Sequence, residues 1–403
     1  MYGHPFVGIF PEDDSDADSD LTTLSLLGLA GFAAAGGACV PTLFNGSFTG
    51  CPLSLGGIVT TPYGPAAGSN VNGDADGVGN AARFSQPADI TTDGTFFYVA
   101  DLGNNKIRRI DPATGAVTTP YGPAAGSTAS GDTDGTGNAA RFTQPSAITT
   151  DGTHLYVTDF GNNKIRRIVI ATGVVTTLAG PAPGSTAGGD TDGTGNAARF
   201  TQPFGIAYDG AHLYVADFGN NKIRRIDPTT GVVTTPYGPS QGNTAGGDAD
   251  GFGNAARFQN PQGIAISLDG ANLYISDATN NKIRQIAIAT GAVTTLAGPA
   301  PGSTANGDAD GVGNAARFRS PLGIFTDGTS LYVPEFTNHK VRQIDLASRS
   351  VSTLAGPAPG SNASGDLDGT GNAAFFNQPG GLLSDGTQLY IADIFNNKIR
   401  LIR

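Results

Sequence analysis

Apolar and polar residues follow the pattern of short strands along most of the chain. In the stretch 131–188, short runs of β-branched and apolar residues occupy 147–150, 155–158, 164–168 and 174–178. Asp-Gly, Asn-Asn and Thr-Gly sequences separate these runs, and such turns between β-prone segments are typical of hairpins. No stretch shows the sustained 3.6-residue apolar period of a helix. The pattern therefore predicts four short antiparallel strands with no helices between them.

This four-strand unit is repeated along the chain. The motif Gly-Asp-x-Asp-Gly-x-Gly-Asn-Ala-Ala occurs six times and begins at Gly73, Gly131, Gly189, Gly247, Gly307 and Gly365. The successive spacings are 58, 58, 58, 60 and 58 residues. A repeat near this length indicates a solenoid, a propeller or an array of supersecondary units. Four antiparallel strands per unit match the blade of a β-propeller.

The two ends of the chain indicate that the repeats form a closed ring. The sixth copy stops at its third strand, 398–402, and lacks a fourth. A matching strand lies far upstream, where 57–64 (Gly-Ile-Val-Thr-Thr-Pro-Tyr-Gly) resembles 115–122 (Gly-Ala-Val-Thr-Thr-Pro-Tyr-Gly). An N-terminal strand that completes the last blade removes the exposed sheet edges. We therefore predict an all-β fold: a six-bladed β-propeller of four-stranded blades over 57–403, preceded by a non-propeller arm, 1–56.

Short segments of each copy resemble the NHL-repeat proteins. In the third copy they are Pro-Phe-Gly-Ile-Ala at 203–207, Leu-Tyr-Val-Ala-Asp at 213–217 and Gly-Asn-Asn-Lys-Ile-Arg at 219–224. The preceding Asp-Gly-x-Gly-x-x-x-Arg-Phe at 192–200 resembles the long-loop variety of bacterial members. The resemblance covers 57–403 and implies the propeller fold. It implies little about function, because that family includes RNA binders, kinase sensor domains and a lyase.

The charge of the chain narrows the range of its partners. The net charge is −11, from 34 acidic and 23 basic residues. Residues 1–56 carry six acidic and no Lys or Arg residues, so 57–403 carry 28 acidic and 23 basic ones, a net charge of −5. An acidic surface repels polyanions, so we expect no nucleic-acid partner.

Residues 21–35 form an apolar segment that the predicted propeller does not require. Its length resembles that of a signal-peptide core, but the preceding 12–20 are acidic where a signal peptide is basic. The segment is also rich in Gly, Ala and Thr, which argues against a membrane span. We expect it to dock on the next identical subunit, since such head-to-tail contacts build rings or filaments. The apolar residues expected to make this contact are Leu21, Leu24, Leu26, Leu27, Leu29 and Phe32.

Cys39 and Cys51 are the two cysteines of the chain, and both lie in a segment punctuated by Gly and Pro. A disulfide that closes this small loop suits an exported protein, and two free thiols are the alternative. We predict the disulfide, which would stabilise the junction between arm and propeller by about 2–3 kcal/mol.

The Asp-x-Asp-Gly motif is the strongest candidate for a metal site. Two carboxylates at i and i+2 beside an Asn and turn carbonyls are possible ligands of Ca²⁺. The Gly comes too early for a helix–loop–helix calcium site, however, and the distal Glu is missing. We instead expect the Asp side chains to cap a tight turn and to face Arg83, Arg141, Arg199, Arg257 and Arg317. The weak calcium candidates are Asp74, Asp76, Asp132, Asp134, Asp190, Asp192, Asp248, Asp250, Asp308, Asp310, Asp366 and Asp368.

No set of residues indicates catalysis. An acidic residue follows the second strand in every copy, which favours a structural hydrogen-bonding role over a single active site. His154 and His212 occupy one repeat position and resemble exposed strand-start residues, while His339 replaces a turn Asn. A lyase of the resembled family would need several histidines that converge on a metal. We therefore predict a protein that is not an enzyme and has no cofactor.

Two functional hypotheses remain. The first is an extracellular or cell-surface structural protein whose propellers are joined by their arms into a homopolymer or filament. Its Ser/Thr-rich loops, such as 183–188, are candidate glycan sites. The second is a secreted monomeric propeller that binds a small ligand or peptide at the mouth of its channel.

Overall fold

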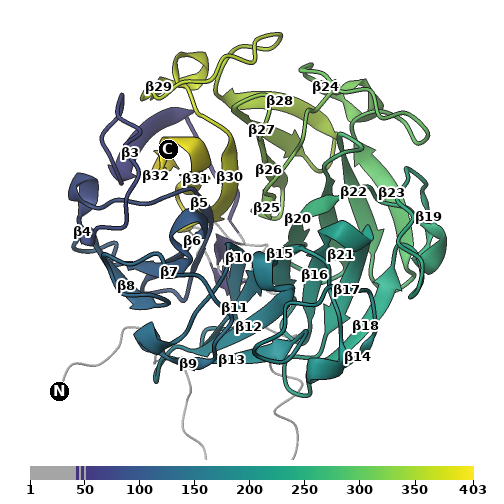
Figure 1. Ribbon diagram of the computed structural model, residues 1–403. Helices are drawn as coiled ribbons and strands as arrows, with labels where there is room; N and C mark the ends of the chain where they lie inside the picture. The colour runs from purple at the N-terminus through teal and green to yellow at the C-terminus, as the bar shows by residue number, and fades with distance from the viewer. Residues whose placement is uncertain (1–41, 45–46, 50) are drawn as a thin grey trace, which may run out of the picture. The chain divides into compact units, whose positions relative to one another are not determined.

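The computed structural model describes residues 42–44, 47–49 and 51–403. In this part of the chain six antiparallel sheets surround a central axis, and each sheet is one blade (Figure 1). The predicted six-bladed β-propeller is therefore confirmed. The predicted assembly residues of 21–35 and Cys39 lie outside the described residues.

The blades are numbered along the chain. Blade 1 contains β4 (Gly77–Val78), β5 (Pro87–Thr92), β6 (Phe97–Asp101), β7 (Lys106–Ile110) and β8 (Ala116–Tyr121). Blade 2 contains β9 (Gly135–Thr136), β10 (Pro145–Thr150), β11 (His154–Asp159), β12 (Lys164–Val169) and β13 (Val174–Ala179). Blade 3 contains β14 (Gly193–Thr194), β15 (Pro203–Tyr208), β16 (Leu213–Asp217), β17 (Lys222–Ile226) and β18 (Val232–Tyr237).

The remaining blades repeat this order. Blade 4 contains β19 (Gly251–Phe252), β20 (Pro261–Ile266), β21 (Asn272–Asp277), β22 (Lys282–Ala287) and β23 (Ala292–Ala297). Blade 5 contains β24 (Gly311–Val312), β25 (Phe325–Thr326), β26 (Ser330–Glu335), β27 (Lys340–Asp345) and β28 (Ser350–Ala355). Blade 6 contains β29 (Gly369–Thr370), β30 (Pro379–Ser384), β31 (Leu389–Asp393), β32 (Lys398–Ile402) and, from the start of the propeller, β3 (Ile58–Tyr63).

Each blade has five strands, one more than the sequence pattern predicts. The additional strand has two residues and lies at the outer edge; in blade 3 it is β14, which pairs with Val232 and Val233 of β18. It comes from the Asp-x-Asp-Gly-x-Gly motif and has no apolar run, so strand patterns do not reveal it. One-turn 3-10 helices follow this short strand or the second long strand: η1 (Gly79–Ala81), η2 (Leu102–Asn104), η3 (Gly137–Ala139), η4 (Phe160–Asn162), η5 (Gly195–Ala197), η6 (Phe218–Asn220), η7 (Gly253–Ala255), η8 (Gly313–Ala315), η9 (Gly371–Ala373) and η10 (Ile394–Asn396).

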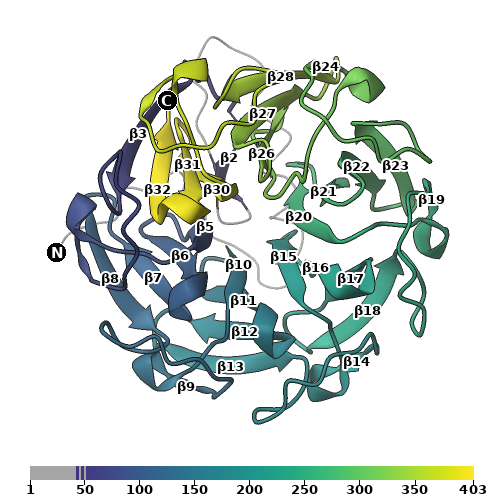
Figure 2. The ribbon, with the colours of Figure 1, turned by 45° about the horizontal axis from the view of Figure 1, so that its top comes forward.

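The N-terminal strand closes the ring as predicted. β3 lies between β29 and β32, with Val59 opposite Ile402 and Tyr63 opposite Ile399. The equivalent pair in blade 1 places Val117 opposite Ile110 and Tyr121 opposite Ile107. Figure 2 shows β3 beside the C-terminal strand β32, so the two ends of the propeller meet within one sheet.

The hydrophobic core lies between neighbouring blades. Each core cluster joins apolar side chains from two adjacent sheets; one of them combines Tyr98 and Ile107 of blade 1 with Phe142, Ile148 and Val157 of blade 2. The clusters on both sides of blade 6 contain residues of β3, with Val59 in one and Tyr63 in the other. Because sheets bury both faces in this arrangement, the strands read as apolar runs rather than strict alternation.

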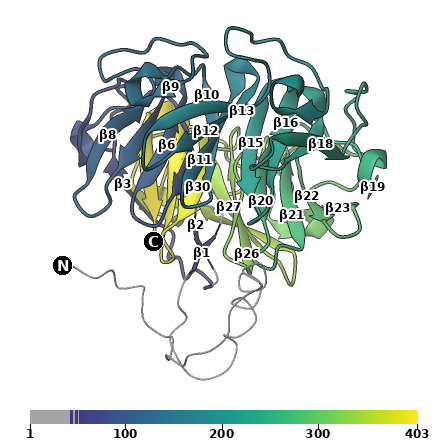
Figure 3. The ribbon, with the colours of Figure 1, turned by 90° about the horizontal axis from the view of Figure 1, so that it is seen from below.

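The segment before β3 also packs on the propeller. In the hairpin of β1 (Thr42–Phe44) and β2 (Ser47–Thr49), β2 contacts β30, and Figure 3 shows the hairpin on one face of the ring, below the blades. The backbone N–H of Leu53 donates to Asp327 Oδ2 at 2.9 Å, and Leu53 packs against the core between blades 5 and 6. Asp327 follows the end of β25, so this attachment is at the face where the innermost strands end. Among the residues described, no helix is long and apolar enough to span a membrane.

Candidate functional site

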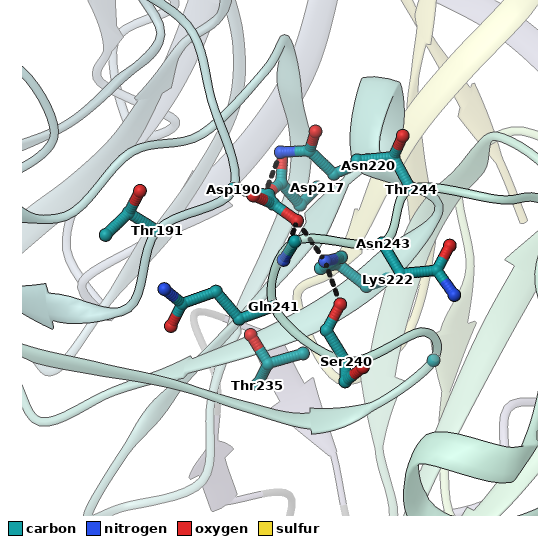
Figure 4. Close-up of polar contacts among 12 residues, drawn as sticks. Asp190, Thr191, Asp217, Asn220, Lys222, Thr235, Ser240, Gln241, Asn243 and Thr244 are labelled. Carbon is teal, nitrogen blue, oxygen red and sulfur yellow. Dashed lines mark hydrogen bonds and ion pairs between the residues drawn. The ribbon is translucent and has the colours of Figure 1, made fainter.

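A network of buried ion pairs recurs in all six blades, and Figure 4 shows part of it in blade 3. Lys222 and Arg224 stand two residues apart on β17, so their side chains lie on the same face of the strand. Neither side chain has any exposed surface. Lys222 Nζ lies 2.9 Å from Asp190 Oδ2, and Arg224 Nη2 lies 2.8 Å from Asp192 Oδ1. The strand thereby holds both carboxylates of the Asp-x-Asp-Gly motif.

Asp217 is the third carboxylate of this network and is fully buried at the end of β16. Its Oδ2 accepts hydrogen bonds from Arg224 Nη1 at 2.7 Å and from Asn220 Nδ2 at 2.8 Å. Its Oδ1 accepts the backbone N–H of Thr201 at 2.8 Å. The Arg224 guanidinium also lies over the Phe200 ring, 4.9 Å from the centroid, which adds a cation–π contact. The acidic residue after the second long strand therefore has a structural role, in agreement with the prediction.

The predicted arginine partners of the Asp-x-Asp-Gly carboxylates are wrong. Arg199 Nη1 donates instead to the backbone carbonyls of Asn196 and Ala198, both at 2.7 Å. The partners are the Lys and Arg of the third long strand. The sixth copy, which has Phe375 at the position of Arg199, makes the same ion pairs through Lys398 and Arg400.

These ion pairs bear directly on the calcium hypothesis. Burial opposes ionisation of Asp190, but the hydrogen bond and the charge of Lys222 outweigh it and hold the pKa of Asp190 below its usual value. Asp192 Oδ1 also accepts the Thr235 hydroxyl at 2.7 Å. Within the described part of the chain, no group of three or more His, Cys, Asp or Glu residues is placed to hold a metal ion. The positive charge that these carboxylates require is thus supplied by the protein's own side chains.

We predict that a calcium chelator leaves the melting temperature of the protein unchanged. The reason is that the ammonium group of a lysine and the guanidinium group of an arginine, rather than Ca²⁺, neutralise the two carboxylates of each motif. Differential scanning calorimetry with and without chelator measures this, and Mg²⁺ serves as the control cation. A lower melting temperature that added Ca²⁺ restores would contradict the prediction, because a ligand of the folded state stabilises it by mass action.

Turn residues after the second long strand connect neighbouring blades. Asn163 has a left-handed backbone with φ 55°, and its Oδ1 accepts the backbone N–H of Gln202 in the next blade at 2.7 Å. His339 occupies this position in blade 5, and its Nδ1 accepts the N–H of Gln378 at 3.0 Å. Burial lowers the pKa of His339, which suits a neutral acceptor. His154 is partly exposed at the start of β11, so the described histidines occupy separate structural positions.

The strongest candidate for a binding site is at one end of the central channel. A cavity of about 400 Å³ opens there between the beginnings of the innermost strands and the turns after the second long strand. We call this cavity the channel mouth. Four phenylalanines line it: Phe204, Phe218, Phe336 and Phe395. Phe204 and Phe218 have ring centroids 6.3 Å apart, and those of Phe336 and Phe395 are 6.2 Å apart, so two pairs of neighbouring aromatic rings line the mouth.

The six copies differ from one another at the channel mouth. After the proline that begins the innermost strand they have Ala88, Ser146, Phe204, Gln262, Leu322 and Gly380. After the acidic residue of the second long strand they have Leu102, Phe160, Phe218, Ala278, Phe336 and Ile394. The ion-pair network, in contrast, has the same Lys and Arg in every copy. The near-identical repeats therefore place unlike side chains around one cavity.

Next to the mouth, the backbones of neighbouring innermost strands approach closely, and we call this part of the channel the waist. A Cβ atom added to Gly205 would lie 2.0 Å from the carbonyl oxygen of Gln262 in the next blade. One added to Gly263 would lie 2.3 Å from the carbonyl oxygen of Leu322. Contacts this short are not possible for real side chains, so these positions require glycine.

In blade 1, Asp89 occupies the repeat position that Gly205 occupies in blade 3. The other copies have Ala147, Gly205, Gly263, Gly323 and Gly381 there. Asp89 Oδ2 accepts the backbone N–H of Ile148 at 2.9 Å. Burial raises the pKa of Asp89 to about 7, although hydrogen bonds from the N–H groups of Ile148 and Ile90 favour the charged form. Two small channel cavities of about 60 and 50 Å³ adjoin Asp89, and it is the one charged residue among those lining them.

The motifs and spacings of the sequence single out neither Asp89 nor the phenylalanines of the mouth. A signal was nevertheless present: in an alignment of the six copies, Asp89 is the one acidic residue at its position. The predicted Cys39–Cys51 disulfide stays a prediction, because Cys39 lies outside the described residues.

Known proteins share both the repeat and the fold. NHL repeat-containing protein 2 of Gallus gallus is 29% identical over 345 residues, which are 78% of this chain and 46% of that protein. Protein SUPPRESSOR OF QUENCHING 1, chloroplastic, of Arabidopsis thaliana is 29% identical over 282 residues, 67% of this chain and 26% of that protein. The chain thus spans less than half the length of either relative. No family model matches the chain.

A solved structure agrees with the architecture. An auxiliary nutrient binding protein from Bacteroides thetaiotaomicron superposes with a TM-score of 0.63 over 86% of this chain and 76% of that one, at 18% identity. At this identity the likeness concerns the fold alone. The repeated sequence motifs, the similarity to NHL repeat-containing proteins and the six-bladed ring agree with one another. Sequence and fold together support an NHL-repeat β-propeller family for this chain.

Proposed function

We propose that this protein is a binding module that holds an apolar ligand, or an apolar side chain of a peptide, in the channel mouth. The observation that carries the proposal is the aromatic cavity of about 400 Å³, built from residues that differ between otherwise similar copies. A structural role alone would be served by the same side chain in every blade, as the ion-pair network illustrates. Unlike residues from different blades are what a ligand without sixfold symmetry requires.

The size and the lining of the mouth support this proposal. A cavity of this volume lies within the range of small-molecule sites, which are mostly apolar with a few polar groups. Phe395 is 41% exposed although it is a large apolar residue, and it contacts the ring of Phe336. The described segment before β3 is attached at the opposite face, through Leu53 and Asp327. An incoming ligand would therefore reach the aromatic rings without displacing the described residues that precede β3.

We further infer that the protein acts without catalysing a reaction. The repeated Asp side chains are held by Lys and Arg ion pairs, and the described histidines occupy separate turn and strand-start positions. This inference supports a binding role for the mouth. The alternative of a homopolymer joined by residues 21–35, and with it an extracellular location, concerns residues outside those described and stays a prediction.

Binding of 2-phenylethanol, a neutral aromatic probe, tests the proposal. Saturation-transfer NMR is expected to detect the probe on the intact protein and to lose the signal when Phe204→Ala and Phe218→Ala are combined. Phe252→Ala is the matched control, since Phe252 lies on the outer strand β19 and is 68% exposed. Binding that survives the double substitution, or that is lost equally in the control, would show that the mouth is not the site.

A further inference from the structure

Asp89 is a partly buried carboxylate that lines the channel and has no cationic partner among the described residues. Two fully buried acids of the second long strands are ion-paired, Asp101 with Arg108 and Asp393 with Arg400. Asp327, buried after the innermost strand β25, instead accepts hydrogen bonds, one of them from the Tyr332 hydroxyl. The innermost strands that flank Asp89, β10 and β30, carry no charged residue. Removing even part of an unpaired carboxylate from water is costly, and natural proteins keep such groups mainly where they have a use.

The position of Asp89 is also connected to the channel mouth. The small cavity beside Asp89 and the mouth share Ala88, Phe204 and Leu322 as lining residues, so the two spaces adjoin. A ligand seated against the phenylalanines can therefore extend a polar end toward the waist. The available space there is small, about 50 Å³ on one side of Asp89 and about 60 Å³ on the other.

Several hydrogen-bond acceptors lie in this region. Gln262 lines the mouth, and its buried Oε1 has no hydrogen-bond partner among the described residues. The carbonyl oxygens of Gln262 and Leu322 lie at the waist beside the glycines of neighbouring blades. A carboxylate and an unpaired side-chain amide oxygen need donors, and an ammonium group supplies three N–H donors together with a positive charge. The faces of phenylalanine rings also attract cations.

We propose that the channel binds a primary ammonium group carried on an apolar body, with Asp89 as its counter-ion at the waist and the phenylalanines of the mouth around its apolar part. This inference rests on the proposed function and specifies the chemical class of the ligand. The confined space beside Asp89 favours a primary ammonium over a bulky quaternary one. The ammonium can belong to a free amine or to a lysine side chain of a peptide, since both present the same group.

Isothermal titration calorimetry with two matched probes tests this inference. The probes are 2-phenylethylammonium and 2-phenylethanol, which have the same apolar body and differ in charge. At pH 8 we expect the ammonium to bind the intact protein at least about tenfold more tightly than the alcohol, because the pair is desolvated. Asp89→Asn keeps an acceptor for the Ile148 N–H but removes the charge, so it should abolish this preference. Asp111→Asn, which changes an acid on the loop after β7, is the matched control and should retain it.

The pH dependence gives a second readout. The pKa of Asp89 is raised to about 7 in the free protein, so the carboxyl is mostly protonated at pH 5 and mostly ionised at pH 8. Lowering the pH from 8 to 5 should therefore weaken binding of the ammonium, which stays charged, and leave the neutral alcohol unaffected. Asp89→Asn should bind both probes equally at both pH values. Asp89→Ala, which installs the residue of blade 2, repeats the test if the asparagine variant does not fold.

Two further titrations distinguish the sources of the ammonium group. N-acetyl-Phe-Lys-Phe-amide and its norleucine counterpart show whether a lysine in a peptide is accepted, and comparison with 2-phenylethylammonium shows whether a free amine is preferred. Equal binding of ammonium and alcohol by the intact protein would overturn this inference while leaving the proposed function in place. Failure of every probe to bind would overturn both.

Discussion

Deleting residues 57–64 is expected to destabilise the whole propeller, because this segment contains the strand that closes the ring. β3 lies between β29 and β32, so its loss leaves β32 with an unpaired edge. Val59 is 1% exposed and Tyr63 is 6% exposed, and they belong to the cores on opposite sides of blade 6. Burial of these two side chains alone contributes about 3–6 kcal/mol. Thermal unfolding followed by circular dichroism should therefore show a markedly lower melting temperature.

Single substitutions within β3 provide the control for this deletion. Val59→Ala removes buried methyl groups and should cost about 1–3 kcal/mol, whereas Ile58→Ala, at a position that is 40% exposed, should change stability by no more than about 0.5 kcal/mol. If the deletion variant melted at the same temperature as the intact chain, closure by β3 would not contribute to stability. The ring would then be held by the remaining strands of blade 6.

The architecture was predictable because the same order of short strands and turns occurs in six copies of the repeat. Each copy presents similar strands and turns, and the displaced match between 57–64 and 115–122 reveals where the ring closes. The fifth strand was not predictable, since β14 consists of Gly193 and Thr194, which have no apolar pattern. It forms because the loop that carries Asp190 and Asp192 is held against the blade by Lys222 and Arg224. Side-chain ion pairs, rather than strand propensity, place it there.

The same ion pairs explain an error in the prediction of the site. Arg199 is close to Asp190 and Asp192 in the sequence, whereas Lys222 is 32 residues beyond Asp190. Sequence proximity favours the near arginine, but the antiparallel blade brings the third long strand under the loop. The channel mouth was missed for a related reason. Its residues come from different blades and become neighbours only through the ring, so no single copy contains the site.

Replacing Asp217 with alanine is expected to destabilise the protein by about 3–5 kcal/mol, because it leaves a buried guanidinium without its counter-ion. Arg224 has no exposed side-chain surface, and its Nη1 lies 2.7 Å from Asp217 Oδ2. The substitution also leaves the backbone N–H of Thr201 and the amide of Asn220 without their acceptor. Thermal or urea-induced unfolding of the intact chain and of the variant measures the loss.

A second substitution separates the cost of an unpaired charge from the cost of lost packing. Combining Asp217→Ala with Arg224→Met removes both charges and keeps a long apolar side chain over Phe200. We expect this double variant to be more stable than Asp217→Ala alone, because breaking one half of a buried pair costs more than replacing the pair. Arg225→Ala is the matched control: Arg225 is the next residue on β17 but is not fully buried, so its loss should have a small effect. A double variant as unstable as the sum of both single substitutions would indicate that packing and hydrogen bonds, not the unpaired guanidinium, set the cost.

Because the same Lys and Arg stand in every copy, the equivalent change Asp101→Ala in blade 1, where Arg108 loses its partner, should give a loss of similar size.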